Sequence, residues 1–379
     1  MEWSASLYRP AREGEDGHFE PRVEEVKQSM TNNDTSQKSA SHEIKVLGVD
    51  LAKQSFHVYG VDEAGRKIVS KKLSRNQLTS FVAKLAPCLI GLEACGGAHH
   101  WVRVFTRFGH RVRMIAPQFV KPYVKSNKND AVDAEAICEA VQRPNMRFVP
   151  AKSLEQQDIQ SLHRVRSQWV ARRTAQANQI RGLLLEYGLI VPQGIGHVRK
   201  AIPDMLEDGD NALTPVFREL LNELYEALVY LDQRIKAIEH KLTTISVQHE
   251  DCQRLLTIPG VGLLTATALL AAIGDVTVFK NGRELAAWLG LVPKQHSTGG
   301  KPTLLGISKR GDTYLRTLLI HGGRSVSRVA HQHQDARNRW IDSIKQRRGE
   351  NISNVAVANK NARIAWALLT KKECYRAAA

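Results

Sequence analysis

Cysteine patterns that bind metal or form disulfides are missing from this sequence. No two cysteines form a Cys-x-x-Cys pair, and no histidines accompany them at zinc-ligand spacing. The five cysteines are scattered along the chain: Cys88, Cys95, Cys138, Cys252 and Cys374. We therefore expect reduced thiols, as in a cytosolic protein, and exclude a disulfide framework and a zinc cage.

Long apolar runs are missing too. The longest, GLLTATALLAAIG, is shorter than the roughly 20 residues that cross a bilayer. The N-terminus lacks the basic and then apolar segments of a secretory signal. The sequence therefore predicts a soluble, cytoplasmic protein without a membrane partner.

Acidic residues are scarce relative to basic ones. The chain has 38 Asp and Glu against 54 Lys and Arg, a formal net charge of +16. Such an excess favours a polyanionic partner, and nucleic acid is the usual one. The 379 residues leave room for more than one domain, because a domain takes roughly 100 to 200 residues.

The first half of the chain changes character at residue 44. Residues 1–43 are polar and of low complexity, which predicts a disordered tail, and Met30 is an alternative start. Beyond them, short β-branched runs predict three antiparallel strands, and strands that alternate with helices follow. We expect residues 44–150 to form an α/β domain, a mixed sheet of about five strands closed by a helix over about 129–142.

Residues 151–250 have a helical pattern. Apolar residues recur at alternating spacings of four and three, as in a coiled coil: Phe217, Leu221, Leu224, Leu228, Leu231, Ile235, Ile238 and Leu242. We expect two long helices, joined by a Gly- and Pro-rich stretch near 188–215, to form an antiparallel hairpin or an oligomer interface. Five arginines of the first helix could bind a nucleic acid backbone or could simply face solvent: Arg164, Arg166, Arg172, Arg173 and Arg181.

Residues 251–372 are expected to be mainly helical. The turn IPGVG between two apolar helices is typical of a helix-hairpin-helix, in which Gly260 and Gly262 would let the backbone approach a DNA phosphate. The alternative is a plain packing corner between helices.

Four acidic residues occupy positions that favour metal chemistry. Asp50 closes the first predicted strand and Glu93 the fourth, while Asp130 and Asp133 lie on one face of the following helix. Carboxylates gathered at one sheet edge repel each other unless a cation is present, and oxygen ligands suit Mg²⁺ or Mn²⁺. Two such ions about 4 Å apart can hold the attacking and leaving oxygens of a phosphodiester. An actin-like ATPase is the rival interpretation of the first hairpin, but the sequence contains no second copy of the α/β unit.

The stretch HSTGGK places a hydroxyl, Ser297, in a basic environment. The basic residues near it are Lys301, Lys309, Arg310, Arg316 and Arg324, and we expect the first four to bind nucleic acid. His296 is adjacent to Ser297, but neighbouring side chains of an extended segment point apart, so a protease-type triad is not indicated. Basic residues around a serine favour phosphate chemistry.

These motifs together resemble a known family. The acids Asp50, Glu93, Asp130 and Asp133, followed by a coiled-coil segment and by IPGVG, LAAWLGLVP, STGGK and GISKRGDTYLR, resemble the DEDD-type insertion-sequence transposases of the one-ten family, relatives of the Piv DNA invertases. The resemblance covers roughly residues 44–370.

The resemblance implies a fold, a site and partners. Residues 44–150 would be a RuvC-like domain of the RNase H fold that holds Mg²⁺ (or Mn²⁺) through the four acids. Residues 151–250 would be a coiled-coil oligomerisation segment, and residues 251–372 a helical transposase domain in which Ser297 forms a phosphoserine bond to DNA. The family further implies homo-oligomers with composite sites, a structured guide (bridge) RNA, and work at the bacterial nucleoid.

Two alternatives stay open from the residues alone. A RuvC-like junction endonuclease would hydrolyse DNA by two-metal chemistry, with Ser297 merely structural. A non-catalytic protein would bind DNA or RNA through its basic helices.

Overall fold

The structure is a computed structural model that describes residues 43–125, 130–299 and 301–376. The predicted tail and the alternative start at Met30 therefore lie outside the described residues, except for residue 43. Within the described part, every helix is too short or too polar to cross a membrane.

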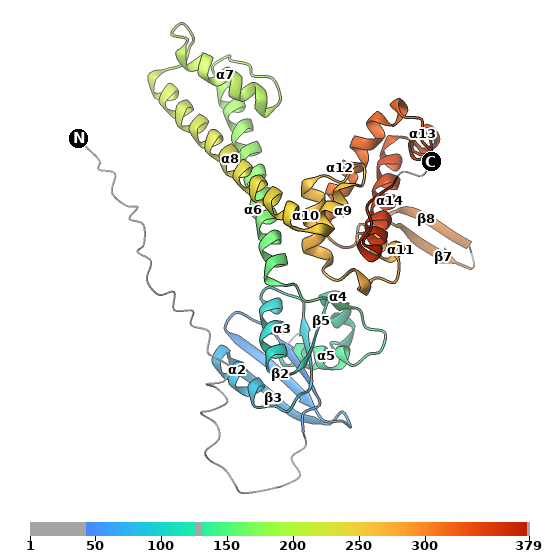
Figure 1. The fold of residues 1–379 in the computed structure, drawn as a ribbon. Coiled ribbons are helices and arrows are strands. Elements are labelled where there is room, and N and C mark those ends of the chain that lie inside the picture. Colours follow the sequence, from blue (N-terminus) through green and yellow to red (C-terminus); the bar gives the residue numbers. More distant parts are fainter. Residues whose placement is uncertain (1–42, 126–129, 300, 377–379) are drawn as a thin grey trace, which may run out of the picture.

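A six-stranded sheet forms the N-terminal part (Figure 1). Its strands in spatial order are β3 (Lys67–Ser74), β2 (Ser55–Val61), β1 (Val46–Asp50), β4 (Leu89–Glu93), β5 (Arg111–Ile115) and β6 (Phe148–Val149). The first three pair antiparallel, β4 and β5 continue parallel to β1, and β6 returns antiparallel. The predicted mixed sheet is confirmed. Its sixth strand, only two residues long, is too short to leave a pattern in the sequence.

Helices cover both faces of this sheet. On one face, α2 (Arg75–Ala83) and α3 (Ala98–Arg107) pack against the strands through residues such as Leu78 and Trp101. On the other face lies α5 (Asp130–Val141), which contacts β1, β2, β4 and β5. The short helices α4 (Pro117–Val120) and η1 (Lys121–Tyr123) precede it. The helix predicted over 129–142 is thus confirmed within the described residues.

A long helical hairpin rises from the sheet domain (Figure 1). It consists of α6 (Leu154–Leu185), α7 (Ile195–Glu207) and α8 (Pro215–Gln248). The pairs Arg166–Glu239 and Arg173–Asp232 show that α6 and α8 run antiparallel, as predicted. Helix α7 was missed, because its glycine-rich surroundings and the internal Pro203 indicated a loop. Supercoiling of the pair, and with it a true coiled coil, stays a prediction.

The C-terminal part is a helical unit built around α14 (Glu350–Lys371), which contacts α9, α11, α12 and α13. The elements before it are α9 (Glu250–Leu256), α10 (Leu263–Ile273), η2 (Val276–Val278), α11 (Gly282–Trp288), β7 (Pro293–Thr298), β8 (Lys301–Ile307), α12 (Thr313–Val329), η3 (Ala330–Gln332) and α13 (Ala336–Arg348). One apolar core joins α9, α10, α11, α12 and α14. The domain boundaries themselves stay a prediction.

A buried histidine joins the hairpin to this C-terminal unit. His163 of α6 lies 2.9 Å from the hydroxyl of Tyr314 on α12 and 2.9 Å from that of Thr267 on α10. Burial lowers the pKa of His163 to about 4, because the charged imidazolium loses its hydration. The neutral ring therefore links three helices by hydrogen bonds.

Candidate active site

Two glycines let α5 lie directly on the sheet. Gly48 of β1 and Gly91 of β4 are partners in the parallel register. A Cβ on Gly48 would lie 2.2 Å from the carbonyl oxygen of Ala134, and one on Gly91 would lie 2.9 Å from Cβ of Val141. Any larger residue would push the helix away from the strands.

Each of these glycines is followed, two residues later, by an acid at the end of its strand. Asp50 ends β1 and Glu93 ends β4. Residues two apart in a strand face the same side of the sheet, so both acids lie on the face that α5 covers. The carboxyl ends of two neighbouring parallel strands thus present carboxylates to the same helix.

The first turn of α5 contributes two more acids, Asp130 and Asp133. The partial positive charge of a helix N-terminus favours carboxylates there. One carboxylate oxygen each of Asp50, Asp130 and Asp133 lies within 4.8 Å of the others; Asp50 and Asp133 are half-buried and Asp130 is exposed. The sequence had placed these three acids together, and the structure does so as well.

Glu93 stands close by but outside that 4.8 Å group. Glu93 and Asp50 both lie near Cys95. The pKa of the Cys95 thiol is raised first by partial burial and then by these two carboxylates. The fourth predicted ligand therefore flanks the group of three.

The donor set fits a divalent metal ion. Three carboxylates supply only hard oxygen donors, which Mg²⁺ and Mn²⁺ prefer, and their mutual repulsion would be relieved by a cation. The acids of the α5 flank, Glu135 and Glu139, are instead engaged by Lys125, at 3.7 Å and 3.0 Å. This pairing with a lysine separates Glu135 and Glu139 from the group of three aspartates.

His57, which no sequence motif marks, lies beside the acids. It is the antiparallel partner of Asp50 on β2, and its Nδ1 lies 3.6 Å from Oδ2 of Asp130. Its side chain is mostly buried, with 16% exposed. Side chains alternate between the two faces of a sheet, so the pairing of the first two strands would have placed His57 on the same face as Asp50, but the sequence does not give the register of that pairing.

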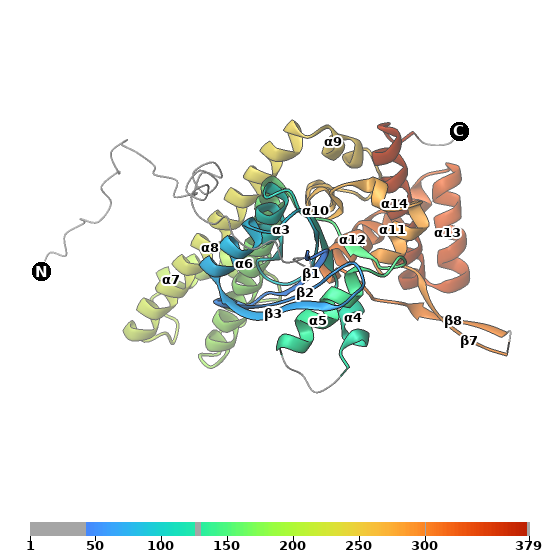
Figure 2. The same cartoon turned by 90° about the horizontal axis from the view of Figure 1, so that it is seen from below.

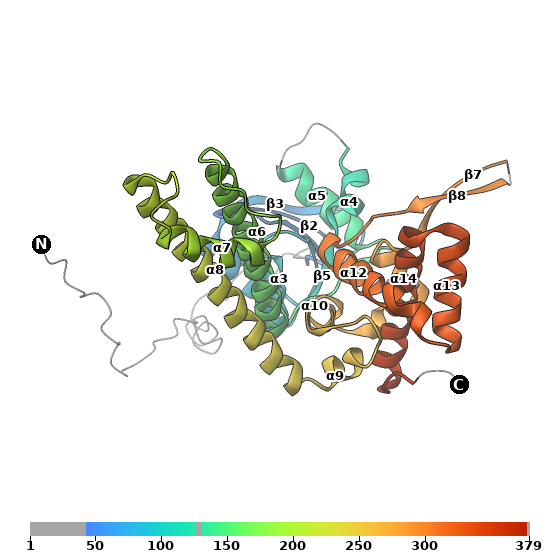
Figure 3. The same cartoon turned by 90° about the horizontal axis from the view of Figure 1, so that it is seen from above.

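Ser297 lies on a β-hairpin, formed by β7 and β8. In the hairpin of β7 and β8, Ser297 pairs with Pro302, and every residue of β7 is exposed. The Gln295 side-chain amide donates a hydrogen bond to Ser297 Oγ at 2.8 Å. The hairpin projects from the C-terminal unit, well away from α5 in all three views (Figures 1, 2 and 3).

The predicted basic residues near the serine have different surroundings. Lys301 is exposed on β8, and Lys309 and Arg310 are exposed in the loop that follows the hairpin. Arg316 is buried, and its Nη1 donates to the carbonyl oxygens of Leu289 at 3.4 Å and Arg310 at 3.2 Å. This burial argues against a phosphate contact and gives Arg316 the role of holding the loop in place.

The turn between α9 and α10 packs closely against α12 at Gly260 but not at Gly262. Gly260 has φ of +87°, and a Cβ there would lie 2.7 Å from the carbonyl oxygen of Gly322 on α12. Gly262 is exposed, and a Cβ there would meet nothing within 4 Å. Packing explains Gly260, whereas a DNA contact at either glycine stays a prediction.

Three of the five arginines singled out on α6 are used internally. Arg166 pairs with Glu239 and Arg173 with Asp232, while Arg181 donates to the carbonyl oxygen of Val191. Arg164 and Arg172 are exposed. Only these last two keep an open face for a nucleic acid backbone.

Comparison with known proteins identifies the family. A profile described as a DEDD transposase of IS110 type matches residues 47–189, and one described as the transposase IS116/IS110/IS902 family matches residues 252–340. A probable family 20 transposase of Pseudomonas aeruginosa is 51% identical over 331 residues, 87% of this chain and 98% of that protein. The chain belongs to the IS116/IS110/IS902 family of transposases. The transposase for insertion sequence element IS1111A of Coxiella burnetii is 48% identical over 337 residues, 89% of this chain and 93% of that protein.

The two matched regions of this transposase contain the two parts of the candidate site. The four acids fall in the first region and Ser297 in the second. The mixed sheet under the acids is consistent with the predicted RNase H-like domain. The enzyme is a DNA transposase, so DNA is its substrate. A shorter match bears on the predicted relation to DNA invertases. A pilin gene-inverting protein of Moraxella bovis is 41% identical over 69 residues, which are 17% of this chain and 21% of that protein.

Proposed function

We propose that this transposase cuts and rejoins DNA through Ser297, at a site where Asp50, Glu93, Asp130 and Asp133 hold Mg²⁺ (or Mn²⁺). The observation that carries the proposal is the convergence of Asp50, Asp130 and Asp133 within 4.8 Å of one another. Carboxylates that hold a metal ion are engaged as its ligands, so a covalent link to DNA would need a nucleophile from another side chain. An exposed serine on a basic hairpin can supply it.

The proposed chemistry divides between the two parts. A bound divalent ion would stabilise the negative charge that develops on the phosphate and the leaving oxygen. Ser297 Oγ attacks the phosphorus, the bond to the leaving strand breaks, and the serine proton ends on the released hydroxyl. Attack by a hydroxyl of another strand then restores the serine and rejoins the DNA, without net hydrolysis.

The hairpin itself favours Ser297 over its neighbours as the nucleophile. Gln295, two residues before it on the same face of β7, donates to its Oγ at 2.8 Å. This bond uses one lone pair of the hydroxyl and orients it, and it leaves the second lone pair and the proton for the reaction. His296 lies on the opposite face of the strand, so it is not placed to act as the base.

We further propose that the active site is composite. The hairpin that carries Ser297 projects away from the helix that carries Asp130 and Asp133 (Figure 3). A second subunit can bring its serine to these acids. The proposal therefore includes a homo-oligomer, a dimer or tetramer.

A structured bridge RNA is proposed as a second nucleic acid partner that chooses donor and target DNA. The net charge of +16 is enough for contacts with two polyanions. Sequencing of the RNA that copurifies with the transposase tests this part.

Trapping of covalent adducts tests the nucleophile. With labelled DNA of the element ends and Mg²⁺, we expect the wild-type chain to form a protein–DNA adduct that survives denaturation. Ser297→Ala should lose it by at least about 1000-fold, since the attacking atom is removed. Asp50→Ala should abolish both adduct and recombination.

Two neighbouring hydroxyls provide matched controls. Thr298→Ala and Ser308→Ala should form the adduct at wild-type level. Adducts that persist in Ser297→Ala would refute the assignment of the serine. Metal-dependent cleavage without any adduct would instead support a junction endonuclease, and binding without cleavage would support a non-catalytic protein.

A further inference from the structure

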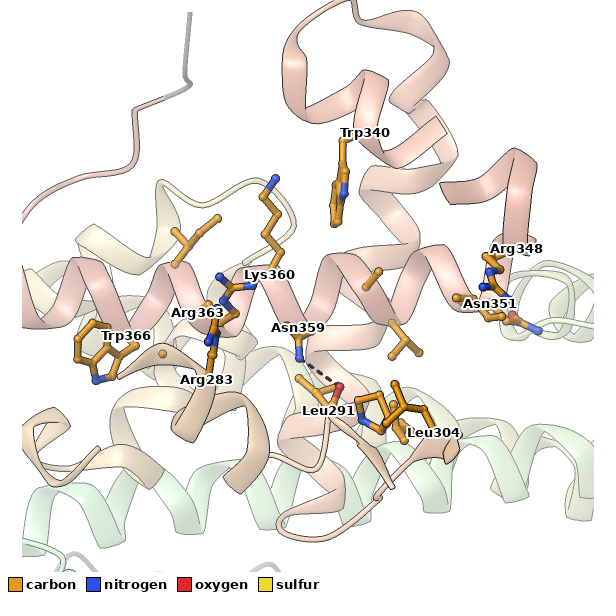
Figure 4. Close-up of a pocket in the computed structure, with 18 of the residues that line it drawn as sticks. Arg283, Leu291, Leu304, Trp340, Arg348, Asn351, Asn359, Lys360, Arg363 and Trp366 are labelled. Atoms are coloured by element: carbon orange, nitrogen blue, oxygen red, sulfur yellow. Dashed lines mark hydrogen bonds between the residues drawn. The ribbon is translucent and has the colours of Figure 1, made fainter. Parts of the chain in front are cut away.

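A groove opens between α14 and the root of the β7–β8 hairpin (Figure 4). Its volume is about 1540 Å³, whereas a small-molecule pocket takes about 300–1,000 Å³. Helices α11 and α13 complete its walls. The groove is therefore sized for a segment of a larger ligand.

The charged side chains that line the groove are positive. Four cationic residues line it: Arg283, Arg348, Lys360 and Arg363. No aspartate or glutamate is among the lining residues of the described chain. Lys360 shows this crowding of cations: its pKa is lowered first by burial and then by the positive charges of the nearby Arg337 and Arg363. An anion would relieve this crowding.

Apolar and aromatic side chains also line the groove. Leu304 of β8 is 67% exposed and Ile352 of α14 is 54% exposed, so apolar area faces the groove without a partner. Trp340 and Trp366 lie at its sides (Figure 4). Both rings are held in place, Trp366 by donating from Nε1 to the carbonyl oxygen of Phe279 and Trp340 by the ammonium of Lys360, 4.2 Å from its ring centre.

We propose that this groove binds an unpaired strand of the DNA substrate. Cations next to fixed aromatic and apolar surfaces suit single strands, whose phosphates and bare bases are both within reach, whereas a duplex presents mainly phosphates. DNA is the strand chosen because the enzyme is a DNA transposase.

The position of the groove ties it to the strand exchange proposed above, on which this inference rests. Pro293 and Ile307, which pair at the root of the hairpin, both line the groove. The same hairpin carries Ser297 near its tip. A strand lying in the groove would therefore continue toward the hydroxyl that is proposed to attack it.

Binding of a fluorescein-labelled dT12 oligonucleotide to the full chain, followed by anisotropy, tests the inference. Trp340→Leu keeps apolar packing but removes the ring, and should weaken binding about 5- to 150-fold. Arg363→Ala should lower the slope of log affinity against log salt by about 0.7, the value for one phosphate contact on a single strand. An oligonucleotide carrying 5-iododeoxyuridine should crosslink to the peptide that contains Trp340.

Matched residues outside the groove serve as controls. Trp288, which is 39% exposed and packs on Phe279, and Arg328, exposed on α12, do not line the groove. Trp288→Leu and Arg328→Ala should bind dT12 as the wild type does, and all variants should keep the wild-type melting temperature.

Three results would overturn the inference. Trp340→Leu and Arg363→Ala could bind dT12 as tightly as the wild type does. These variants could also lose as much affinity for a blunt duplex as for dT12, or lose affinity only for the RNA oligomer U12. Failure of the serine mechanism would look different. In that case Ser297→Ala would still form adducts, while Trp340→Leu would still lose affinity for dT12.

Discussion

At the scale of single residues, a histidine stands beside the acids of the proposed metal site. His57 is mostly buried, whereas the Asp130 side chain that it approaches at 3.6 Å is 64% exposed. An exposed carboxylate samples many rotamers, so a fixed neighbour restricts it. We expect His57 to orient Asp130 toward the ion, in the way that residues behind metal ligands do.

Replacement of this histidine tests that role. His57→Ala should weaken Mn²⁺ binding about 10-fold, because Asp130 loses the group that orients it. His57→Gln, which can still hydrogen bond, should recover part of the affinity. Calorimetric titration of the apoprotein with Mn²⁺ measures both.

The control for this prediction is the cross-strand neighbour of His57. Lys72 pairs with His57 on β3 and is exposed. Lys72→Ala should bind Mn²⁺ with wild-type affinity. The role of His57 is refuted if His57→Ala binds Mn²⁺ as tightly as the wild type.

At the scale of elements, the site depends on how closely α5 approaches β1 and β4. That approach requires Gly48 and Gly91, and it brings the first turn of α5 to the ends of the two strands. The acids are thus placed by backbone contact between a helix and a sheet. Neither element alone holds a complete set of ligands.

A methyl group at this contact should separate the elements. Gly48→Ala puts Cβ 2.2 Å from the carbonyl oxygen of Ala134, and we expect it to destabilise the fold by about 1–3 kcal/mol or more. Because α5 must move, Mn²⁺ affinity should fall as well. Urea unfolding and metal titration of the same samples measure the two effects.

Gly182 in α6 is the matched control. A Cβ at that position meets nothing within 4 Å, so Gly182→Ala should stabilise the helix by about 0.5–1 kcal/mol. A Gly48→Ala chain with wild-type stability and metal affinity would contradict the proposed contact.

The elements differ in how well the sequence predicts them. The strands β1, β2 and β4 were expected because short apolar runs are typical of strands buried in a sheet, and the helix α5 was expected because strands and helices alternate in this part of the chain. The hairpin around Ser297 was not predicted, because every residue of β7 is exposed and no alternation of apolar and polar residues marks it.

At the scale of the whole molecule, one helix separates the two halves of the proposed site. Helix α6 starts at the sheet domain and runs alongside the C-terminal unit, to which His163 joins it by hydrogen bonds to Tyr314 and Thr267, and α8 leads back to that unit (Figure 1). A rigid connection of this kind keeps the Ser297 hairpin of one chain away from the acids of that chain. This spacing is the reason for proposing a composite site.

Mixed oligomers of two inactive variants test the composite site. Asp50→Ala keeps the serine and Ser297→Ala keeps the acids, so a site shared between subunits is intact once in each mixed pair. Coexpression should restore adduct formation, and the DNA should be attached only to the Asp50→Ala chain, identified by a size tag. Restoration should be absent when the variants are separately purified and do not exchange subunits.

A site contained in one chain predicts a different result. Each subunit of the mixed oligomer would then lack either the acid or the serine, and no adduct would form. Attachment to the Ser297→Ala chain would also refute the proposal, because that chain has no attacking hydroxyl at this position.

The sequence by itself determined the mixed sheet and the long helices and marked the acids as candidate metal ligands, because apolar runs, helical periodicity and strand-end position are local properties of the chain. It also carried the family resemblance that comparison with known transposases confirms. Only the tertiary structure decided that His57 joins the acids, that Arg316 is buried in the fold, that Gly260 serves packing, and that a cationic groove lies beside the serine hairpin. These features depend on contacts between residues far apart in the sequence, which no local pattern records.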